Sequence, residues 1–304
     1  MNQTIYPIGI QNFEKIRKDG YLYIDKTALI YQLVKTGSYY FLSRPRRFGK
    51  SLLLSTLEAY FQGKKELFEG LAMEKLEKEW TKHPILHFDL NISHYDAPDS
   101  LYKILNDTLS RYEEEYGTRP TEETLPLLID EYDKPLLQNL HDEETQNRFR
   151  NMLKPFYGVL KTMDRAIRFA LLTGVTKFGK VSVFSDLNNL DDISMREPYA
   201  AICGITETEL RTHFDEDIHT LASALERTYE EARSLLRKRY DGYHFVAGGP
   251  GIYNPFSLLN TFKYMRLSDY WFETGTPTYL MELLKRTNYD LYDMANTETD
   301  ADVL

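Results

Sequence analysis

The 304-residue sequence contains a single cysteine, Cys203, so it excludes an internal disulfide framework and a cysteine-rich zinc site. No apolar run approaches the ~18 residues of a membrane-spanning helix, and the first residues lack the pattern of a secretion signal. Basic residues number 37 against 46 acidic ones, for a net charge of −9, which disfavours non-specific DNA binding by the whole surface. These absences predict a cytoplasmic protein with no membrane partner.

Length and composition allow a large folded core. The chain is long enough for about two domains on a prior of ~150 residues each, and its 42% hydrophobic and 27% charged content is typical of a globular protein. Apolar runs that read as strands alternate with helical patterns between residues 39 and 174. This alternation predicts an α/β domain of three layers around a mostly parallel sheet, with its ligand at the carboxyl ends of the strands.

The densest basic stretch lies between a predicted strand at residues 39–43 and a predicted helix at residues 50–61. Strand, loop, Gly-Lys-Ser and helix is the order of a phosphate-binding P-loop. Backbone N–H groups of such a loop point at an anion, Lys50 reaches the β- and γ-phosphates, and the Ser51 hydroxyl ligates Mg²⁺. The predicted nucleotide-binding residues are Arg44, Pro45, Arg46, Arg47, Phe48, Gly49, Lys50 and Ser51.

One position of this stretch departs from the full P-loop pattern. The pattern has a glycine five residues before Gly49, where this chain has Arg44. Pro45 fixes its own φ, and together with the arginines it makes the loop stiffer and more positive than usual. Taken alone, the stretch also fits a basic, solvated loop that caps an ordinary helix.

A second apolar run, residues 125–129, ends in Asp130-Glu131. An Asp at the carboxyl end of a neighbouring strand holds Mg²⁺ beside the P-loop serine, and a following Glu can polarise an attacking water. A solvated turn is the alternative for this pair alone. The order and flanking patterns of the two stretches together favour ATP and Mg²⁺ binding, with Ser51 and Asp130 as metal ligands and Glu131 as the catalytic base.

A further strand is predicted at residues 165–174 and ends in Thr173-Gly174. A polar residue at the end of such a strand can touch the γ-phosphate or the attacking water, which makes Thr173 a second candidate catalytic residue. A simple turn threonine is the alternative interpretation.

The character of the sequence changes after Gly204. Helical patterns at 206–214, 217–225, 228–240 and 257–266 surround two short extended pieces, which predicts a small helical or winged-helix-like lid domain over residues 205–270. Residues 1–204 then form the ATP-binding domain, and their first 37 residues are an extension that often packs near the nucleotide base in such proteins. The charged run at 64–82 predicts a solvated helical excursion, and residues 271–304 read as a frayed tail or the start of a further domain.

Several motifs of this sequence resemble those of the bacterial AAA-ATPase-like family. They follow the order of that family and extend over roughly residues 4–280. They include the arginine-rich P-loop, in which Arg44 is the norm for that family, and the run Asp130-Glu131-Tyr132-Asp133-Lys134-Pro135. The others are residues 7–9, 23–27, 172–174, 184–189, 204–207, 240–243 and 253–256.

The resemblance implies a P-loop ATPase of the ASCE type. Lys50 and Ser51 then contact phosphate and Mg²⁺, Asp130 holds Mg²⁺ and Glu131 is the base. Many similar proteins carry a PD-(D/E)XK nuclease-like domain after the ATPase. Residues 271–304 contain no Asp…Glu-x-Lys pattern, so no nuclease activity is predicted for them, and this chain either lacks that module or stops before it.

Three functions are compatible with these patterns. The first is an ATP-hydrolysing switch that moves residues 206–270, and the second is a nucleotide-binding regulatory module with negligible turnover, which controls an attached nuclease-like domain or a DNA-related partner. The third, DNA binding through the lid, is disfavoured by the acidic balance. An arginine acting from a neighbouring chain in a homo-oligomer is a further expectation, by analogy, with Arg165, Arg168 and Arg196 as candidates.

Overall fold

The computed structural model describes residues 4–91, 94–117, 123–176 and 189–274. A five-stranded sheet lies at its centre in the order β2-β3-β4-β1-β5, and every pairing in it is parallel. The predicted α/β fold with a parallel sheet is therefore confirmed. The strands are β1 Tyr39–Ser43, β2 Leu86–Asp89, β3 Leu125–Asp130, β4 Ile167–Gly174 and β5 Asp191–Asp192.

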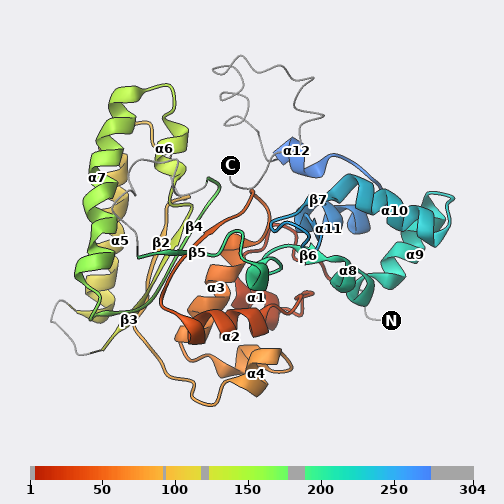
Figure 1. Cartoon of the computed structure of the whole chain (residues 1–304), viewed down its shortest axis with the longest axis horizontal. Helices are drawn as coiled ribbons and strands as arrows, with labels where there is room; N and C mark the ends of the chain where they lie inside the picture. The colour runs from red at the N-terminus through yellow and green to blue at the C-terminus, as the bar shows by residue number, and fades with distance from the viewer. Residues whose placement is uncertain (1–3, 92–93, 118–122, 177–188, 275–304) are drawn as a thin grey trace.

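The sheet is buried on both faces because its side chains alternate between two cores. Tyr40 and Leu42 point into one apolar cluster, whereas Phe41 between them points into the other. The first cluster is covered by α1 Phe13–Lys18, α2 Thr27–Thr36 and α3 Lys50–Phe61. The second is covered by α5 Ser100–Tyr116, α6 Lys134–Gln138 and α7 Glu143–Thr162. Figure 1 shows these two helical layers on either side of the strands.

The prediction of a solvated helical excursion at residues 64–82 is confirmed only in part. This stretch forms only two short helices, η1 Lys65–Phe68 and α4 Ala72–Leu76, joined to β2 by irregular chain. Phe68 and Met73 are fully buried in the same core cluster as α3. The run is rich in charge, but its few apolar residues pack into the core cluster that contains α3.

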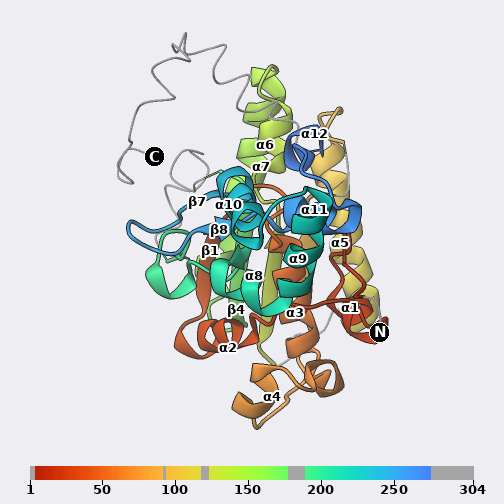
Figure 2. The ribbon, with the colours of Figure 1, turned by 90° about the vertical axis from the view of Figure 1, so that its right-hand side faces the viewer.

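The C-terminal part of the described chain has an apolar core of its own. Three short strands pair antiparallel in the order β6-β8-β7, and the two predicted extended pieces correspond to β7 and β8. Figure 2 views this part from the front. Its elements are β6 Ile205–Thr206, α8 Glu207–His213, α9 Asp215–Ala224, α10 Tyr229–Tyr240, β7 Asp241–Tyr243, β8 Ile252–Tyr253, α11 Pro255–Tyr264 and α12 Tyr270–Thr274, and the 3₁₀ turn η3 Glu197–Tyr199 precedes them.

The N-terminal segment joins these two parts. Phe13 of α1 packs in the core around α3, whereas Tyr6, Ile8, Leu22 and Ile24 pack against the C-terminal cluster. The Lys26 ammonium adds two short contacts to the Glu209 carboxylate on α8, at 2.6 and 2.7 Å. The segment predicted as an extension of the ATP-binding domain is thus shared between both cores.

Two predictions fall partly outside the described residues. The motif at residues 184–189 has only Asn189 within them, and the segment at 271–304 has only residues 271–274. The domain boundaries at 204 and 270 stay predictions. Among the helices that the structure describes, none has both the length and the apolar character needed to cross a membrane.

Candidate nucleotide-binding site

The predicted P-loop connects the carboxyl end of β1 to the first turn of α3. Gly49 precedes the helix with φ of 98°, a left-handed conformation that glycine adopts without steric penalty. Arg47 also has a positive φ, 68°, which is unusual for a residue with a side chain. The loop therefore turns so that the unpaired N–H groups of the first turn of α3 face the pocket described below.

The two predicted metal ligands lie in direct contact. The Ser51 hydroxyl donates to Asp130 Oδ2 at 2.5 Å, and the Thr173 hydroxyl donates to the other oxygen, Oδ1, at 2.6 Å. Asp130 ends β3 and Thr173 lies near the end of β4, and because parallel strands share one carboxyl edge the three side chains converge. The carboxylate is 3% exposed, so both of its oxygens are held in fixed directions.

Lys50 and Glu131 form the second contact of the site. The Lys50 ammonium lies 3.2 Å from Glu131 Oε1 and donates to the backbone carbonyls of Arg44, at 2.9 Å, and Pro45, at 3.4 Å. Glu131 has φ of 52°, and a non-glycine residue in this region carries strain of about 1–3 kcal/mol. Strained residues of this kind cluster at functional sites, which agrees with a catalytic role for Glu131.

Asp133 fixes the chain that follows β4. It is fully buried, and its Oδ2 accepts hydrogen bonds from the Val175 and Thr176 amides and from the Thr176 hydroxyl, at 3.1, 2.7 and 2.5 Å. Burial and, after it, the charge of Glu131 raise the pKa of Asp133 to about 6. The carboxyl thus ties the turn after β3, which contains Glu131, to the turn after β4.

Lys50, Ser51 and Glu131 open onto a cavity of about 350 Å³. Arg46, Arg47, Lys50 and Lys134 line it, with Glu131 as the only acidic residue among the lining residues that the structure describes. A chain with a net charge of −9 therefore concentrates positive charge at this point. The excess charge matches a polyphosphate.

Residues that the sequence analysis did not predict as site residues complete this cavity. Half of them belong to the family-like motifs at residues 7–9, 129–135 and 253–256, and the other half carried no signal in the sequence. The full set is Pro7, Ile8, Gly9, Ile10, Gln11, Leu52, Asn91, Lys134, Gln138, Pro255, Phe256 and Leu259.

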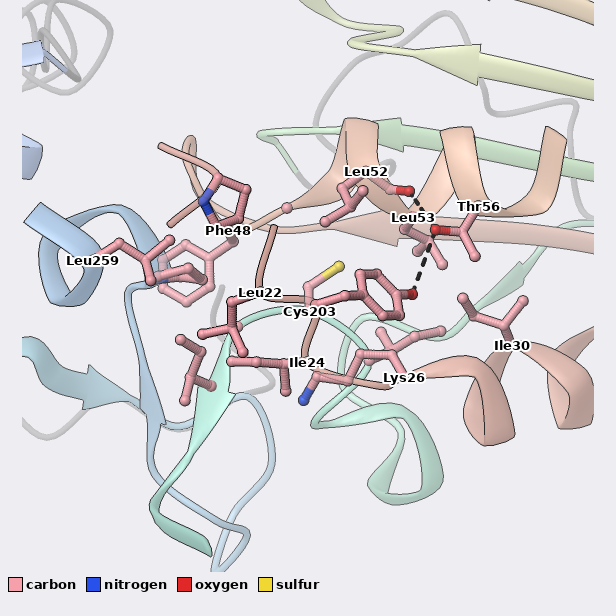
Figure 3. A pocket seen from close by; sticks show the side chains of 17 residues that line it. Leu22, Ile24, Lys26, Ile30, Phe48, Leu52, Leu53, Thr56, Cys203 and Leu259 are labelled. Carbon is pink, nitrogen blue, oxygen red and sulfur yellow. Dashed lines mark hydrogen bonds between the residues drawn. The ribbon is translucent and has the colours of Figure 1, made fainter. Parts of the chain in front are cut away.

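A smaller and mostly apolar cavity of about 110 Å³ adjoins the first, and both are bounded by Gly49, Leu52 and Leu259. Figure 3 shows its leucine and isoleucine side chains around the Cys203 thiol, whose pKa is raised by burial. The thiol is therefore protonated and behaves as a small apolar group. The two cavities together offer one charged and one apolar compartment on either side of the α3 N-terminus.

Comparison with known proteins agrees with this arrangement. A family model described as "Predicted AAA-ATPase" matches residues 7–125 and 118–184 of the chain. The chain belongs to this family. It is also 40% identical, over 305 residues, to an "Uncharacterized protein in vnfD 5'region" of Azotobacter chroococcum mcd 1. That match covers 93% of this chain and 57% of the relative, so the chain spans little more than half of the relative's length.

In this AAA-ATPase family member, the residues of the predicted P-loop do not all lie at the cavity. Lys50, Gly49, Arg46, Arg47 and Ser51 line the larger cavity. The remaining side chains of the loop and Thr173 do not. Phe48 is buried in the core beside α3, and Thr173 is fully buried behind Asp130. Thr173 is therefore placed to orient Asp130, and a contact with nucleotide stays a prediction.

The Arg44 side chain does not line the larger cavity. Its guanidinium is 1% exposed and donates to the carbonyls of Ser194, at 2.6 Å, and Tyr199, at 3.3 Å. It also lies 3.8 Å from the ring centroid of Phe245, a cation–π distance. This side chain anchors the loop to the chain after β5, and a contact of Arg44 with nucleotide stays a prediction.

Replacing Arg44 by methionine is expected to lower the free energy of unfolding by about 2–3 kcal/mol, because buried carbonyls lose their donor. Urea denaturation of Arg44→Met and wild type measures the difference, and Arg211→Met on the exposed side of α8 is the control, expected within about 0.5 kcal/mol of wild type. Unchanged stability combined with lost nucleotide binding would return Arg44 to a direct phosphate role.

The rest of the loop is also attached to the C-terminal part. Phe48 packs edge-on against Tyr243 at 4.6 Å between ring centroids, and its carbonyl accepts the Gly204 amide at 3.0 Å. Arg47 lies 5.0 Å from the Phe256 ring, and the Trp271 indole donates to the Arg46 carbonyl at 2.9 Å. A displacement of the loop would therefore act on the C-terminal elements directly.

Proposed function

We propose that this chain binds ATP together with Mg²⁺ and hydrolyses it to ADP and phosphate as a nucleotide-driven switch. The observation that carries the proposal is that Lys50, Ser51 and Glu131 line one positively charged cavity, while the buried Asp130 accepts the Ser51 hydroxyl directly behind it. These four residues come from β1–α3 and from the end of β3, which lie 80 positions apart in the sequence but share one edge of the sheet.

The phosphates are placed against the first turn of α3 and the Lys50 ammonium. Two of the present partners of Lys50 are neutral backbone carbonyls, and the third is the single charge of Glu131. A triphosphate presents several negative charges, so the ammonium exchanges these contacts for phosphate oxygens on binding. That exchange frees the Glu131 carboxylate for its own role.

Ser51 and Asp130 are a suitable pair of protein ligands for Mg²⁺. Both supply oxygen, which this ion requires, and their present mutual contact of 2.5 Å places them at one point. The described residues contain no group of three or more His, Cys, Asp or Glu placed for a metal ion. In P-loop enzymes the bound ion neutralises charge that develops on the β- and γ-phosphates.

Glu131 acts as the general base. Its carboxylate accepts a proton from water as the water oxygen bonds to the γ-phosphorus, while the bond from that phosphorus to the β–γ bridging oxygen breaks and ADP leaves with the electron pair. Asp130 is held in place by its hydrogen bonds from Ser51 and Thr173. Asp133 holds the two turns in place, and Thr173 orients Asp130.

The strand order supports assignment to the ASCE division. β4 lies between the P-loop strand β1 and the Asp-Glu strand β3, so a strand separates the two motifs, as the family resemblance implies.

The apolar cavity next to Leu52 and Leu259 is where the nucleotide base fits best, because the flat faces of a purine are apolar. We also propose that residues 205–270 form a helical or winged-helix-like lid domain.

A regulatory module with negligible turnover is the second candidate. The Lys50–Glu131 ion pair favours it, because the base is occupied until a ligand displaces the lysine. In either case the loop contacts with Tyr243, Phe256 and Trp271 would pass the nucleotide state to the C-terminal elements. The module would control an attached nuclease-like domain or a DNA-related partner, and it could act as a homo-oligomer. The relative is longer than this chain, and the match covers 57% of it.

Equilibrium binding of ATP and phosphate release, each with Mg²⁺ and with EDTA, test the proposal. We expect binding and turnover that both depend on Mg²⁺. Binding without phosphate release at any protein concentration favours the regulatory module. Failure to bind ATP in the presence of Mg²⁺ would refute the proposal, since it would mean that the Arg44-containing loop is not a working P-loop.

A further inference from the structure

Lys134 has a position that the proposed reaction does not yet use. It begins α6, three residues after Glu131, and lines the larger cavity together with Lys50 and Ser51. Its ammonium donates to the Asn91 carbonyl at 3.0 Å and to Asn91 Oδ1 at 2.5 Å. This cation is therefore held between the segments that follow the carboxyl ends of β2 and β3.

The positive charge of Lys134 is not neutralised in the way of other lysines in the described part of the chain. Lys26 is paired with Glu209, and Lys50 is paired with Glu131, whereas the hydrogen-bond acceptors of Lys134 are the neutral oxygens of Asn91. Such an ammonium keeps its capacity to bind an anion.

The charges that face Lys134 also favour an anion. Burial and, after it, the nearby Arg46 lower the pKa of Lys134, while Glu131 and Asp89 act in the opposite direction. Arg46 and Lys134 thus repel each other across the cavity. A negatively charged group between them would relieve this repulsion and would lie next to the catalytic base.

We propose that Lys134 binds the γ-phosphate of ATP and supplies, within the same chain, the cation that many P-loop ATPases take from a neighbouring subunit. This inference rests on the proposed function and extends it to a further catalytic residue. The ammonium would stabilise the charge on the γ-phosphoryl oxygens in the transition state, as an arginine finger does when it is provided in cis. The sequence candidates Arg165, Arg168 and Arg196 would instead act from a neighbouring chain.

The test compares wild type, Lys134→Ala, Lys134→Arg and the control Lys103→Ala, which removes an exposed lysine from α5. Equilibrium binding is measured with Mg²⁺ for ADP and for a non-hydrolysable ATP analogue, and kcat and KM are measured for ATP at several protein concentrations. We expect Lys134→Ala to bind the ATP analogue about 10- to 100-fold more weakly than wild type, because a hydrogen bond to a charged group is lost. Its affinity for ADP is expected to be unchanged. Its kcat is expected to fall about 10³-fold.

The conservative variant separates catalysis from packing. Lys134→Arg is expected to recover most of the triphosphate preference, Lys103→Ala to match wild type, and the specific activity of wild type to be independent of protein concentration.

Equal loss of ADP and triphosphate binding in Lys134→Ala would overturn the inference and leave a structural role, as would an unchanged preference. Wild-type activity that rises with protein concentration would also overturn it, in favour of a cation from a neighbouring chain. Wild type that binds neither nucleotide would refute the proposed function itself.

Discussion

Lys50→Ala is expected to abolish measurable ATP hydrolysis and to weaken ATP binding about 10- to 100-fold, the range for the loss of about 1.5–3 kcal/mol at a hydrogen bond to a charged group. Lys50 is 4% exposed and lies at the point where the loop carbonyls, Glu131 and the α3 N-terminus meet. No other lysine or arginine occupies the first turn of α3. Isothermal titration with MgATP and a phosphate-release assay measure the two effects.

The control for Lys50→Ala is Lys103→Ala, because the Lys103 side chain is 68% exposed and pairs only with Asp99 one turn away. We expect it to bind and hydrolyse ATP like wild type. Circular dichroism establishes that both variants are folded. A folded Lys50→Ala protein with wild-type ATP affinity would contradict the P-loop assignment, whatever its hydrolysis rate.

Glu131→Gln is expected to bind MgATP at least as tightly as wild type but to hydrolyse it about 10²- to 10⁴-fold more slowly, the usual contribution of a general base. The amide has nearly the shape of the carboxylate, so it keeps the backbone at φ of 52° under the same strain. It cannot accept the proton from water. The removal of one negative charge beside the γ-phosphate also favours binding of the anion.

Single-turnover kinetics distinguish slow chemistry from slow product release in Glu131→Gln. The matched control is Glu144→Gln, an exposed carboxylate in the first turn of α7, which is expected to leave both binding and turnover unchanged. If Glu131→Gln hydrolyses ATP at the wild-type rate, Glu131 is not the base, and its pairing with Lys50 is structural.

Much of the fold follows from patterns that are local in the sequence. The alternation of Tyr40, Phe41 and Leu42 between two cores requires that β1 be covered on both faces, and a continuous apolar run expresses this directly. The order of strand, Gly49-Lys50-Ser51 and helix likewise predicted the turn at the start of α3. Such features depend on neighbours within a few residues, so one sequence is enough to find them.

The stretch at residues 64–82 shows where local patterns fail. Its charge predicts a solvated helix, but Phe68 and Met73 are among the most buried residues of the chain. Burial depends on which surfaces meet in space, and two apolar residues among many charged ones do not reveal in sequence that they cover α3. The same limit applies to Pro7 and Leu259, which meet at the cavity from opposite ends of the chain.

The sequence by itself determined the chemistry of the candidate site: a lysine and a serine at a helix N-terminus, and an Asp-Glu pair at the end of a second strand. Only the tertiary structure decided which way each side chain points. It joined the Arg44 side chain to the buried carbonyls of Ser194 and Tyr199, placed Thr173 against Asp130, and brought Asn91 to the Lys134 ammonium. The physical reason is that a motif fixes backbone position and residue type, whereas a side chain's direction is set by the partners that distant segments offer it.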